Sequence, residues 1–204
     1  MGRRELKKEA TRQDLLAAAA NLFKTKGYEA TSVDDIAMAA DVAKGTFYYH
    51  FPAKEDLVFA LQEAELKVAS DRARQRMEGA KESPLAILFD FLNDSAHWTE
   101  SNPELGRAMF KQKFEMMARK EPTHHGPPAT IKEYVFGTIG LLLAAAQQAK
   151  EIRSDVDTSD LAQILIPVVM SARMHWLMEP DGATLTARVE RSLKILMEGF
   201  KPRR

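Results

Sequence analysis

The chain has 204 residues, 45% of them hydrophobic, which is enough for one large core or two small ones. Its 29 Lys and Arg residues balance 29 Asp and Glu residues, so a uniformly basic nucleic-acid-binding surface is excluded. The absence of cysteine excludes disulfides, thiolate catalysis and cysteine-based metal or redox sensing.

The apolar runs are short. The longest, at 139–146 and 164–170, fall below the ~20 residues that a membrane span needs. The N-terminal stretch is polar and shows no secretory signal. We therefore expect a cytoplasmic protein without a membrane partner.

The N-terminus begins with a basic segment that comprises Arg3, Arg4, Lys7, Lys8 and Arg12. It is either an arm that reaches DNA phosphates or an adjacent minor groove, or a frayed and solvated end. The first helix is predicted over 11–26, because apolar residues recur on one face there, and Gly27 is a typical residue for its end.

Two short helices joined by a tight turn follow. In the first, Val33, Ile36, Ala37 and Ala40 have the spacing of one buried helical face. Ser32 and Asp35 have the spacing of a capping box. The connection 41–43 has the length of a helix-turn-helix turn, and the second helix is predicted over 44–50.

The second short helix is crowded with aromatic residues. Phe47 and Phe51 are four apart, so we expect them to share the buried face. Thr46, Tyr48 and Tyr49 then point to the rim or to solvent, where hydroxyls suit phosphates and base edges. A tightly packed aromatic helix in an ordinary bundle, without DNA, is the alternative.

The motifs of this region resemble those of the tetracycline-repressor (TetR) family of bacterial regulators. They read TSV at 31–33, DIA at 35–37, GTFYYHF at 45–51 and KEDL at 54–57. The resemblance covers roughly the first 60 residues. It implies a homodimer whose second helix-turn-helix element reads the major groove, and an all-α C-terminal region that binds an inducer.

The predicted DNA-contacting residues lie in and around these motifs. The sequence departs from the family pattern at Asp34 and Asp35, where a basic or polar side chain is common. Acids there are repelled by DNA unless they serve the cap or pair with a neighbour. The predicted DNA-binding residues are Thr31, Ser32, Lys44, Gly45, Thr46, Tyr48, Tyr49, His50 and Lys54.

The rest of the chain reads as helices separated by proline breaks, with no strand signal. We predict a long helix to about Lys81, then helices over 84–100, 103–120, 130–151, 159–178 and 184–200. The expected fold is all-α: an N-terminal three-helix helix-turn-helix DNA-binding domain, then a larger helical ligand-binding and dimerisation domain. The predicted domains are 1–54 and 55–204, by family resemblance.

Aromatic and methionine side chains of the second domain predict a pocket for a small apolar or aromatic molecule. Ordinary core packing is the alternative. Polar contacts could come from Gln112, Lys113 or Arg173, and the sequence does not select among them. The predicted ligand-binding residues are Phe89, Trp98, Met109, Phe110, Phe114, Met117, Phe136, Met170 and Met174.

The last two helices carry apolar residues on more than one face, which predicts contact with a second subunit as well as the core. Two such helices from each chain would form a four-helix interface.

Histidines and possible catalytic groups give no enzyme signature. His97, His124, His125 and His175 lack metal-ligand spacing, and no nucleophile, paired acid or phosphate-binding loop is recognisable. We predict no enzyme, no cofactor and no metal. The expected function is a ligand-responsive repressor that binds a palindromic double-stranded DNA operator as a homodimer and is released by a small-molecule inducer. The alternatives are a regulator controlled by a metal or a protein partner, and a helical module without a DNA function.

Overall fold

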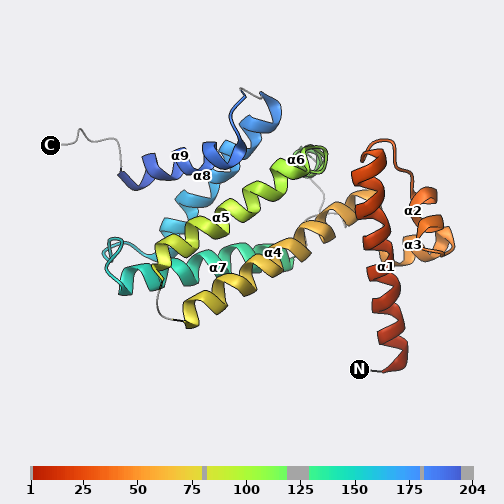
Figure 1. The fold of residues 1–204 in the computed structure, drawn as a ribbon, viewed down its shortest axis with the longest axis horizontal. Coiled ribbons are helices and arrows are strands. Elements are labelled where there is room, and N and C mark those ends of the chain that lie inside the picture. Colours follow the sequence, from red (N-terminus) through yellow and green to blue (C-terminus); the bar gives the residue numbers. More distant parts are fainter. Residues whose placement is uncertain (1, 80–81, 119–128, 180–181, 199–204) are drawn as a thin grey trace. The chain divides into compact units, whose positions relative to one another are not determined.

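The computed structural model describes residues 2–79, 82–118, 129–179 and 182–198. These residues form nine α-helices, and none of them lies in a strand (Figure 1). The prediction of an all-α fold is confirmed. The helices are α1 (Arg3–Lys26), α2 (Val33–Ala39), α3 (Lys44–His50), α4 (Lys54–Glu78), α5 (Pro84–Ser101), α6 (Pro103–Ala118), α7 (Ala129–Gln148), α8 (Thr158–Met178) and α9 (Leu185–Glu198).

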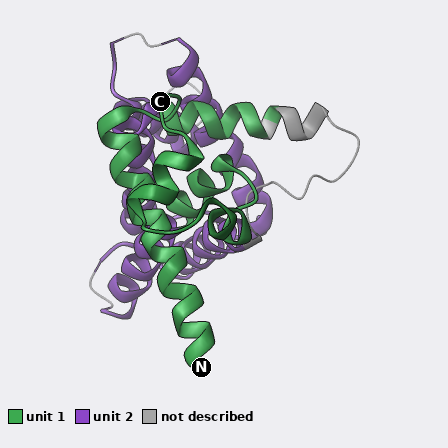
Figure 2. Cartoon of the chain, turned by 90° about the vertical axis from the view of Figure 1, so that its right-hand side faces the viewer, with its two compact units in different colours: residues 1–63, 104–128 green, residues 64–103, 129–204 purple. Residues whose placement is uncertain are grey.

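The chain divides into two compact units, which Figure 2 shows in different colours. Unit 1 comprises residues 1–63 and 104–128, and unit 2 comprises residues 64–103 and 129–204. The change between units falls inside α4, and α6 belongs to unit 1 although α5 and α7 belong to unit 2. The functional division at residues 54 and 55 stays a prediction.

Unit 1 is built on α1, α2, α3 and the start of α4. Because apolar residues recur at helical spacing, each helix turns one side inward. Phe47 is completely buried and its ring lies 6.1 Å from that of the buried Phe51, as predicted. The other core side chains include Leu15, Leu16, Ala19, Phe23, Ile36, Ala37, Leu57 and Val58.

Helix α1 begins at Arg3, whereas the sequence predicted it from Thr11 and left the basic segment as an arm or a frayed end. Its N-terminal turns consist mainly of Lys, Arg and Glu, which have good helix propensity although they form no apolar stripe. A hydrogen bond between Gln13 and Glu9, 2.7 Å long and one turn apart, supports this part. The basic segment is therefore helical.

The turn between α2 and α3 is a Schellman-type helix end. The Val42 amide donates to the Ala37 carbonyl at 2.9 Å and the Asp41 amide donates to the Met38 carbonyl at 3.1 Å. Asp41 takes a left-handed conformation with φ of 53° to close this turn. Aspartate tolerates that region better than most residues, which explains how the turn forms without glycine.

Unit 2 is built on α5, α7, α8 and α9, and α5 packs against each of the other three. Ser83 caps α5 by accepting from the Ala86 amide at 3.1 Å, with Pro84 in the first turn. The core is aliphatic and aromatic; its buried side chains include Ile87, Leu88, Phe91, Leu92, Ile139, Leu142, Leu165, Val169, Leu177, Leu185, Val189 and Leu193.

Helix α8 is, within the described ranges, the one helix long and apolar enough to cross a membrane by length and composition. Counting uninterrupted apolar runs in the sequence did not detect it. The core helix of a soluble protein passes the same test, so the observation is weak evidence for a span. In unit 2, α8 buries one side that includes Leu165, Val169 and Leu177.

Candidate nucleic-acid interface

Helix α3 presents polar and phenolic side chains outward from its buried Phe47. Tyr48 and Tyr49 are 47% and 66% exposed, and Lys44 and Gly45 are also exposed. Thr46 and His50 are half-buried. The edge-to-face packing of Phe47 and Tyr48, with ring centroids 5.4 Å apart, fixes where Tyr48 leaves the helix. The six α3 residues predicted to contact DNA therefore lie on one short helix.

Gly45 has no packing role inside the protein. A Cβ atom placed on it meets nothing within 4 Å, and its φ is not in the left-handed region. Glycine in a helix is less stable than alanine by up to about 1 kcal/mol. The fold therefore does not require glycine at this position. The missing side chain leaves room for another molecule's backbone to approach the exposed start of α3 closely.

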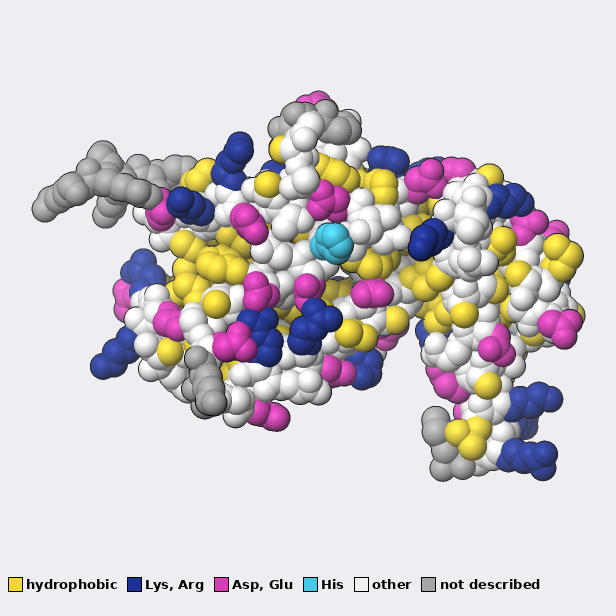
Figure 3. All heavy atoms as spheres, viewed as in Figure 1, with side chains coloured by type: hydrophobic (Ala, Val, Ile, Leu, Met, Phe, Trp, Pro, Cys, Tyr) yellow, Lys and Arg dark blue, Asp and Glu magenta, His cyan; other side chains and the backbone are white. Residues whose placement is uncertain are grey.

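The basic segment of α1 lies beside the C-terminal end of α3. The ammonium of Lys8 is 5.3 Å from the centre of the Tyr49 ring, and the guanidinium of Arg12 is 5.2 Å from that of Phe51. Burial, and then the positive charges of Lys8 and Arg12, lower the pKa of His50. Figure 3 shows basic side chains gathered at the N-terminal end of α1. Helix α3 and the basic segment of α1 therefore lie side by side in unit 1.

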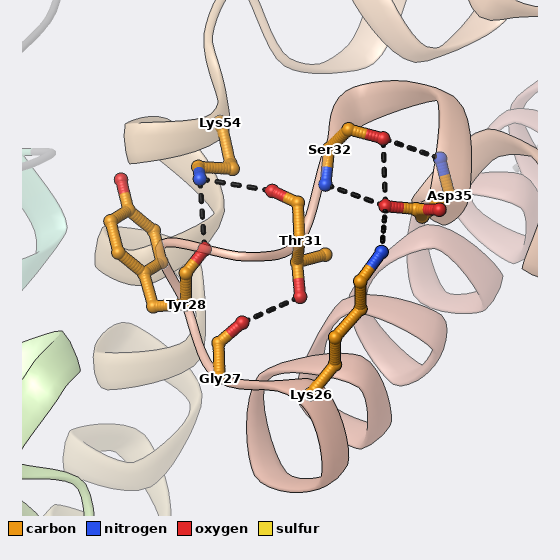
Figure 4. Close-up of polar contacts among 7 residues, drawn as sticks. All are labelled: Lys26, Gly27, Tyr28, Thr31, Ser32, Asp35 and Lys54. Carbon is orange, nitrogen blue, oxygen red and sulfur yellow. Dashed lines mark hydrogen bonds and ion pairs between the residues drawn. The ribbon is translucent and has the colours of Figure 1, made fainter.

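The two acids at the start of α2 are both used inside unit 1. The amide of Asp35 donates to the Ser32 hydroxyl at 3.1 Å, and its carboxylate accepts from the Ser32 amide at 2.8 Å, which completes the predicted capping box (Figure 4). The carboxylate also accepts from Lys26 at 2.6 Å. The bonds from Lys26 and Ser32 hold the pKa of Asp35 well below its usual range.

Asp34 pairs with Lys44 at the start of α3, with 2.9 Å between the closest oxygen and the ammonium nitrogen. Both side chains are more than half exposed, so the pair contributes little to stability. It does neutralise an acid that would otherwise repel DNA. Lys44 is 55% exposed and its ammonium has three N–H donors, so it also has capacity for a phosphate.

Thr31 and Lys54 make hydrogen bonds inside unit 1, and their predicted phosphate contacts stay predictions. The Thr31 hydroxyl is buried and donates to the Gly27 carbonyl at 2.7 Å. The Lys54 ammonium donates to the carbonyls of Tyr28 and Thr31 at 2.9 and 3.0 Å, and lies 4.1 Å from the centre of the Tyr28 ring (Figure 4). These hydrogen bonds stabilise the loop between α1 and α2. Sequence reasoning missed this because the loop and α4 meet only through the fold.

A link from α6 to the same loop was also missed. The Tyr28 amide donates to the Glu104 carboxylate at 2.9 Å, although Glu104 follows Pro103 at the start of a helix far along the chain. Gly27 has φ of 88°, and a Cβ there would lie 3.3 Å from the same carboxylate. From sequence, Glu104 reads only as an acid in the first turn of its helix.

The predicted ligand-binding residues are divided between the two units. Met109, Phe110 and Phe114 lie on α6 in unit 1, and Phe114 is exposed. The side chain of Met117 lies outside the described residues. Those in unit 2 are Phe89 and Trp98 on α5, Phe136 on α7, and Met170 and Met174 on α8. None of the eight described side chains is fully buried.

No group of three or more His, Asp or Glu side chains that could hold a metal ion occurs among the described residues. His97 and His175 are exposed on α5 and α8. His124 and His125 fall outside the described ranges.

The sequence matches two known families. Residues 15–61 match bacterial regulatory proteins of the tetR family, and residues 83–202 match the C-terminal domain of SbtR-like transcriptional regulators. The HTH-type transcriptional regulator AcrR of Shigella flexneri is 27% identical over 204 residues, which covers 97% of this chain and 93% of the relative.

Two solved structures share the fold. FadR of Thermus thermophilus, a TetR-family repressor in complex with lauroyl-CoA, has a TM-score of 0.73 at 22% identity and covers 95% of this chain and 96% of its own. FadR of Bacillus subtilis, in complex with stearoyl-CoA, has a TM-score of 0.66 at 20% identity, with coverage of 93% and 99%.

Proposed function

The chain belongs to the TetR family of bacterial transcriptional regulators, and from that membership we propose that it is a ligand-responsive repressor. It binds a palindromic operator as a homodimer and is released by a small apolar or aromatic inducer. The family consists of regulators rather than enzymes, and its members are generally cytoplasmic, which we propose for this chain too.

The observation that carries the DNA-binding part is the outward face of α3. Tyr48, Tyr49 and Thr46 present hydroxyls and rings around a buried Phe47 anchor, which suits base edges and phosphates in a major groove. The exposed Gly45 permits close approach. The phosphate contacts of Thr31 and Lys54 stay predictions; the Thr31 hydroxyl and two of the three Lys54 donors are used inside unit 1.

Exposed apolar residues support a dimer formed through α8 and α9. Ile164 on α8 is 54% exposed and Ile195 on α9 is 45% exposed, in two helices that already pack on each other. Met178 and Met197 extend this exposed apolar set. In a dimer, the two copies of α3 would enter successive major grooves roughly 34 to 36 Å apart, which demands a near-palindromic site.

The proposed inducer class follows from the side chains of unit 2. The half-buried aromatic and methionine side chains of unit 2 suit an apolar molecule. The two FadR structures hold acyl-CoA thioesters, but their identities of 22% and 20% carry the fold alone. Acyl-CoAs are the first probes to try, because both of these neighbours hold one.

The decisive experiment is selection of bound sequences from random duplex DNA at two salt concentrations, followed by affinity measurement on the enriched site. We expect a palindrome, bound at least tenfold more weakly, or about 1.4 kcal/mol, by Tyr48→Ala and by Thr46→Ala. Gln148→Ala, an exposed change on α7, is the control and should bind normally. Undiminished binding by both α3 variants contradicts the assignment, and no enriched sequence contradicts the DNA function.

Dimerisation is tested separately by sedimentation of Ile164→Asp. A charge in an apolar interface should give a monomer. The monomer should no longer bind the full palindrome tightly, because one half-site supplies only part of the contacts. A variant that sediments with the wild type would place the interface elsewhere. If no small molecule releases the operator, a regulator controlled by a metal or by a protein partner replaces the inducible repressor.

A further inference from the structure

Arg173 is a buried charge in the middle of α8. Its side chain is 6% exposed, and it lies on the same inward side of the helix as Val169 and Leu177. It is the one charged residue among the buried side chains of the described chain. Charged residues are rarely buried to this extent unless an opposite charge accompanies them.

The protein supplies Arg173 with few partners. Its Nη2 donates to the hydroxyl of Ser95 on α5 at 2.8 Å, and its Nη1 lies 4.0 Å from the sulfur of Met170. Its Nε has no hydrogen-bond partner in the described part of the chain. A guanidinium has five N–H donors, so one hydroxyl and one weak thioether acceptor leave most of its capacity unused.

Two other arginines of unit 2 have carboxylate partners. Arg76 pairs with Glu82 and Asp90, and Arg72 pairs with Asp94. These pairs are at least partly exposed to water, where an arginine needs a carboxylate least. No described carboxylate pairs with Arg173, where an anion is needed most.

The guanidinium nonetheless keeps its charge. Burial lowers the pKa of Arg173 to about 10, which still leaves it protonated at neutral pH. The described chain supplies this guanidinium with a hydroxyl and a thioether but with no anion.

We propose that the effector of unit 2 carries an anionic group, such as a carboxylate, that binds Arg173 between α5 and α8. This inference rests on the proposed function, because it specifies the chemistry of the inducer. The anion accepts from Nε and replaces the Met170 sulfur at Nη1, while Ser95 holds Nη2. Met170 has a flexible side chain and can move without breaking a strong bond.

The neighbours of Arg173 define the rest of the molecule. Met170 and Met174 are half-buried and lie three residues before and one residue after Arg173 on α8. Both side chains suit an apolar body next to the anionic head. The effector is therefore an amphiphile: an apolar chain or ring that ends in a carboxylate or an equivalent anion.

The test compares probes that differ only in charge. Dodecanoate, below its critical micelle concentration, and dodecanol, below its solubility limit, are titrated into full-length wild type, Arg173→Gln and Arg173→Lys. Inorganic phosphate serves as an anion without an apolar chain. We expect dodecanoate to raise the wild-type Tm and to bind at least tenfold more tightly than dodecanol. Arg173→Gln should lose this preference, whereas Arg173→Lys should retain part of it, because lysine keeps the charge without the fork of donors.

Arg153→Gln is the matched control, since Arg153 is an exposed arginine paired with Asp155. It should respond to dodecanoate as the wild type does. A second readout needs no ligand: without probe, the Tm of Arg173→Gln should equal or exceed that of wild type, because an unpaired buried charge is removed. A large decrease in Tm would instead show that Arg173 stabilises the fold, and it would overturn the proposal.

Equal responses of wild type and Arg173→Gln to every probe, including no response from either, overturn the proposal. Stabilisation by phosphate alone, without a dodecanoate preference over dodecanol, shows an inorganic anion site and also overturns it. Operator binding by the same wild-type preparation separates this failure from failure of the proposed function. If that binding persists, the repressor assignment stands and only the anionic effector is lost.

Discussion

The polar groups that we propose to bind partners lie on the outer side of α3 in unit 1 and on the inner side of α8 in unit 2. In unit 1, α3 buries Phe47 and leaves Tyr48 and Tyr49 outside. In unit 2, the hydroxyls of Ser70 and Thr138 and the guanidinium of Arg173 are inside. An outward polar group can contact a large partner such as DNA, whereas a buried one can contact only a molecule that enters the core. The two units are suited to partners of different size.

The largest expected effect tests whether the α3 surface depends on its buried anchor. Phe47→Ala removes a completely buried ring and should lower the free energy of unfolding by about 3 to 5 kcal/mol, with loss of operator binding. Denaturant unfolding followed by circular dichroism measures it. Tyr49→Ala, on the exposed side, should stay within about 0.5 kcal/mol of wild type. Similar losses of stability for Phe47→Ala and Tyr49→Ala would contradict the assignment of a buried and an exposed side to α3.

Two buried hydroxyls of unit 2 satisfy each other's hydrogen-bonding needs, so removing only one of them should destabilise the fold. Ser70 and Thr138 are both fully buried and hydrogen-bond to each other. Thr138→Val alone leaves the Ser70 hydroxyl without this partner and should cost about 1 to 3 kcal/mol. Adding Ser70→Ala should recover most of that loss, because neither hydroxyl then remains unpaired. A double variant as unstable as the sum of the single ones would show that no such coupling exists.

A substitution at Gly45 should change the DNA affinity of unit 1 without lowering its stability. Gly45→Ala should leave stability unchanged or raise it by up to about 1 kcal/mol, since a Cβ meets nothing there. Operator affinity should nevertheless fall about tenfold, equivalent to about 1.4 kcal/mol, if DNA approaches the helix closely. Fluorescence anisotropy with the selected operator measures the affinity. Unchanged affinity would show that the glycine faces no DNA.

The Asp35 cap predicts an acid dependence located in unit 1. Lys26 and Ser32 hold the pKa of Asp35 below its ordinary value in the folded chain. Its contribution is therefore fully present above roughly pH 4, the ordinary aspartate value, and is lost as pH falls through the folded value. Asp35→Asn should lower the Tm at neutral pH and flatten its fall in acid. Asp14→Asn, an exposed acid on α1, should leave the Tm profile of wild type unchanged.

The smallest expected effect concerns the left-handed turn before α3. Asp41→Gly removes the steric penalty of φ at 53° and should raise stability by about 1 kcal/mol or less. Ala39→Gly, in the last turn of α2, is the matched control and should lower stability by about 0.5 to 1 kcal/mol. A destabilising Asp41→Gly would mean that the aspartate side chain supports the turn.

Unit 1 was largely predictable because its signals are local. The bounds of α3, the Ser32 and Asp35 cap and the buried Phe47 and Phe51 all follow from spacing within a few residues. The start of α1 was missed because a helix of alternating charges has no apolar period. The roles of Thr31 and Lys54 were missed because they depend on where a distant helix meets a loop.

Unit 2 was predictable as a set of helices but not as a site. Apolar periodicity locates α5 and α8, yet it does not say which of their residues face each other. The sequence offered Arg173 as one of three polar candidates. The structure buries it beside Ser95 and leaves Gln112 half-buried, whereas the side chain of Lys113 lies outside the described residues. A charge inside a helix looks the same in sequence whether it points to water or to the core.

The pairing of Lys44 with Asp34 has a consequence for how operator binding responds to salt. A lysine that binds a phosphate releases a condensed cation from DNA, which contributes about 0.9 to the slope of log affinity against log salt concentration. When Lys44 leaves Asp34, the freed carboxylate attracts a cation back from solution, so this contact contributes less. Asp34→Asn should therefore bind DNA more tightly at low salt and lose affinity more steeply as salt is added.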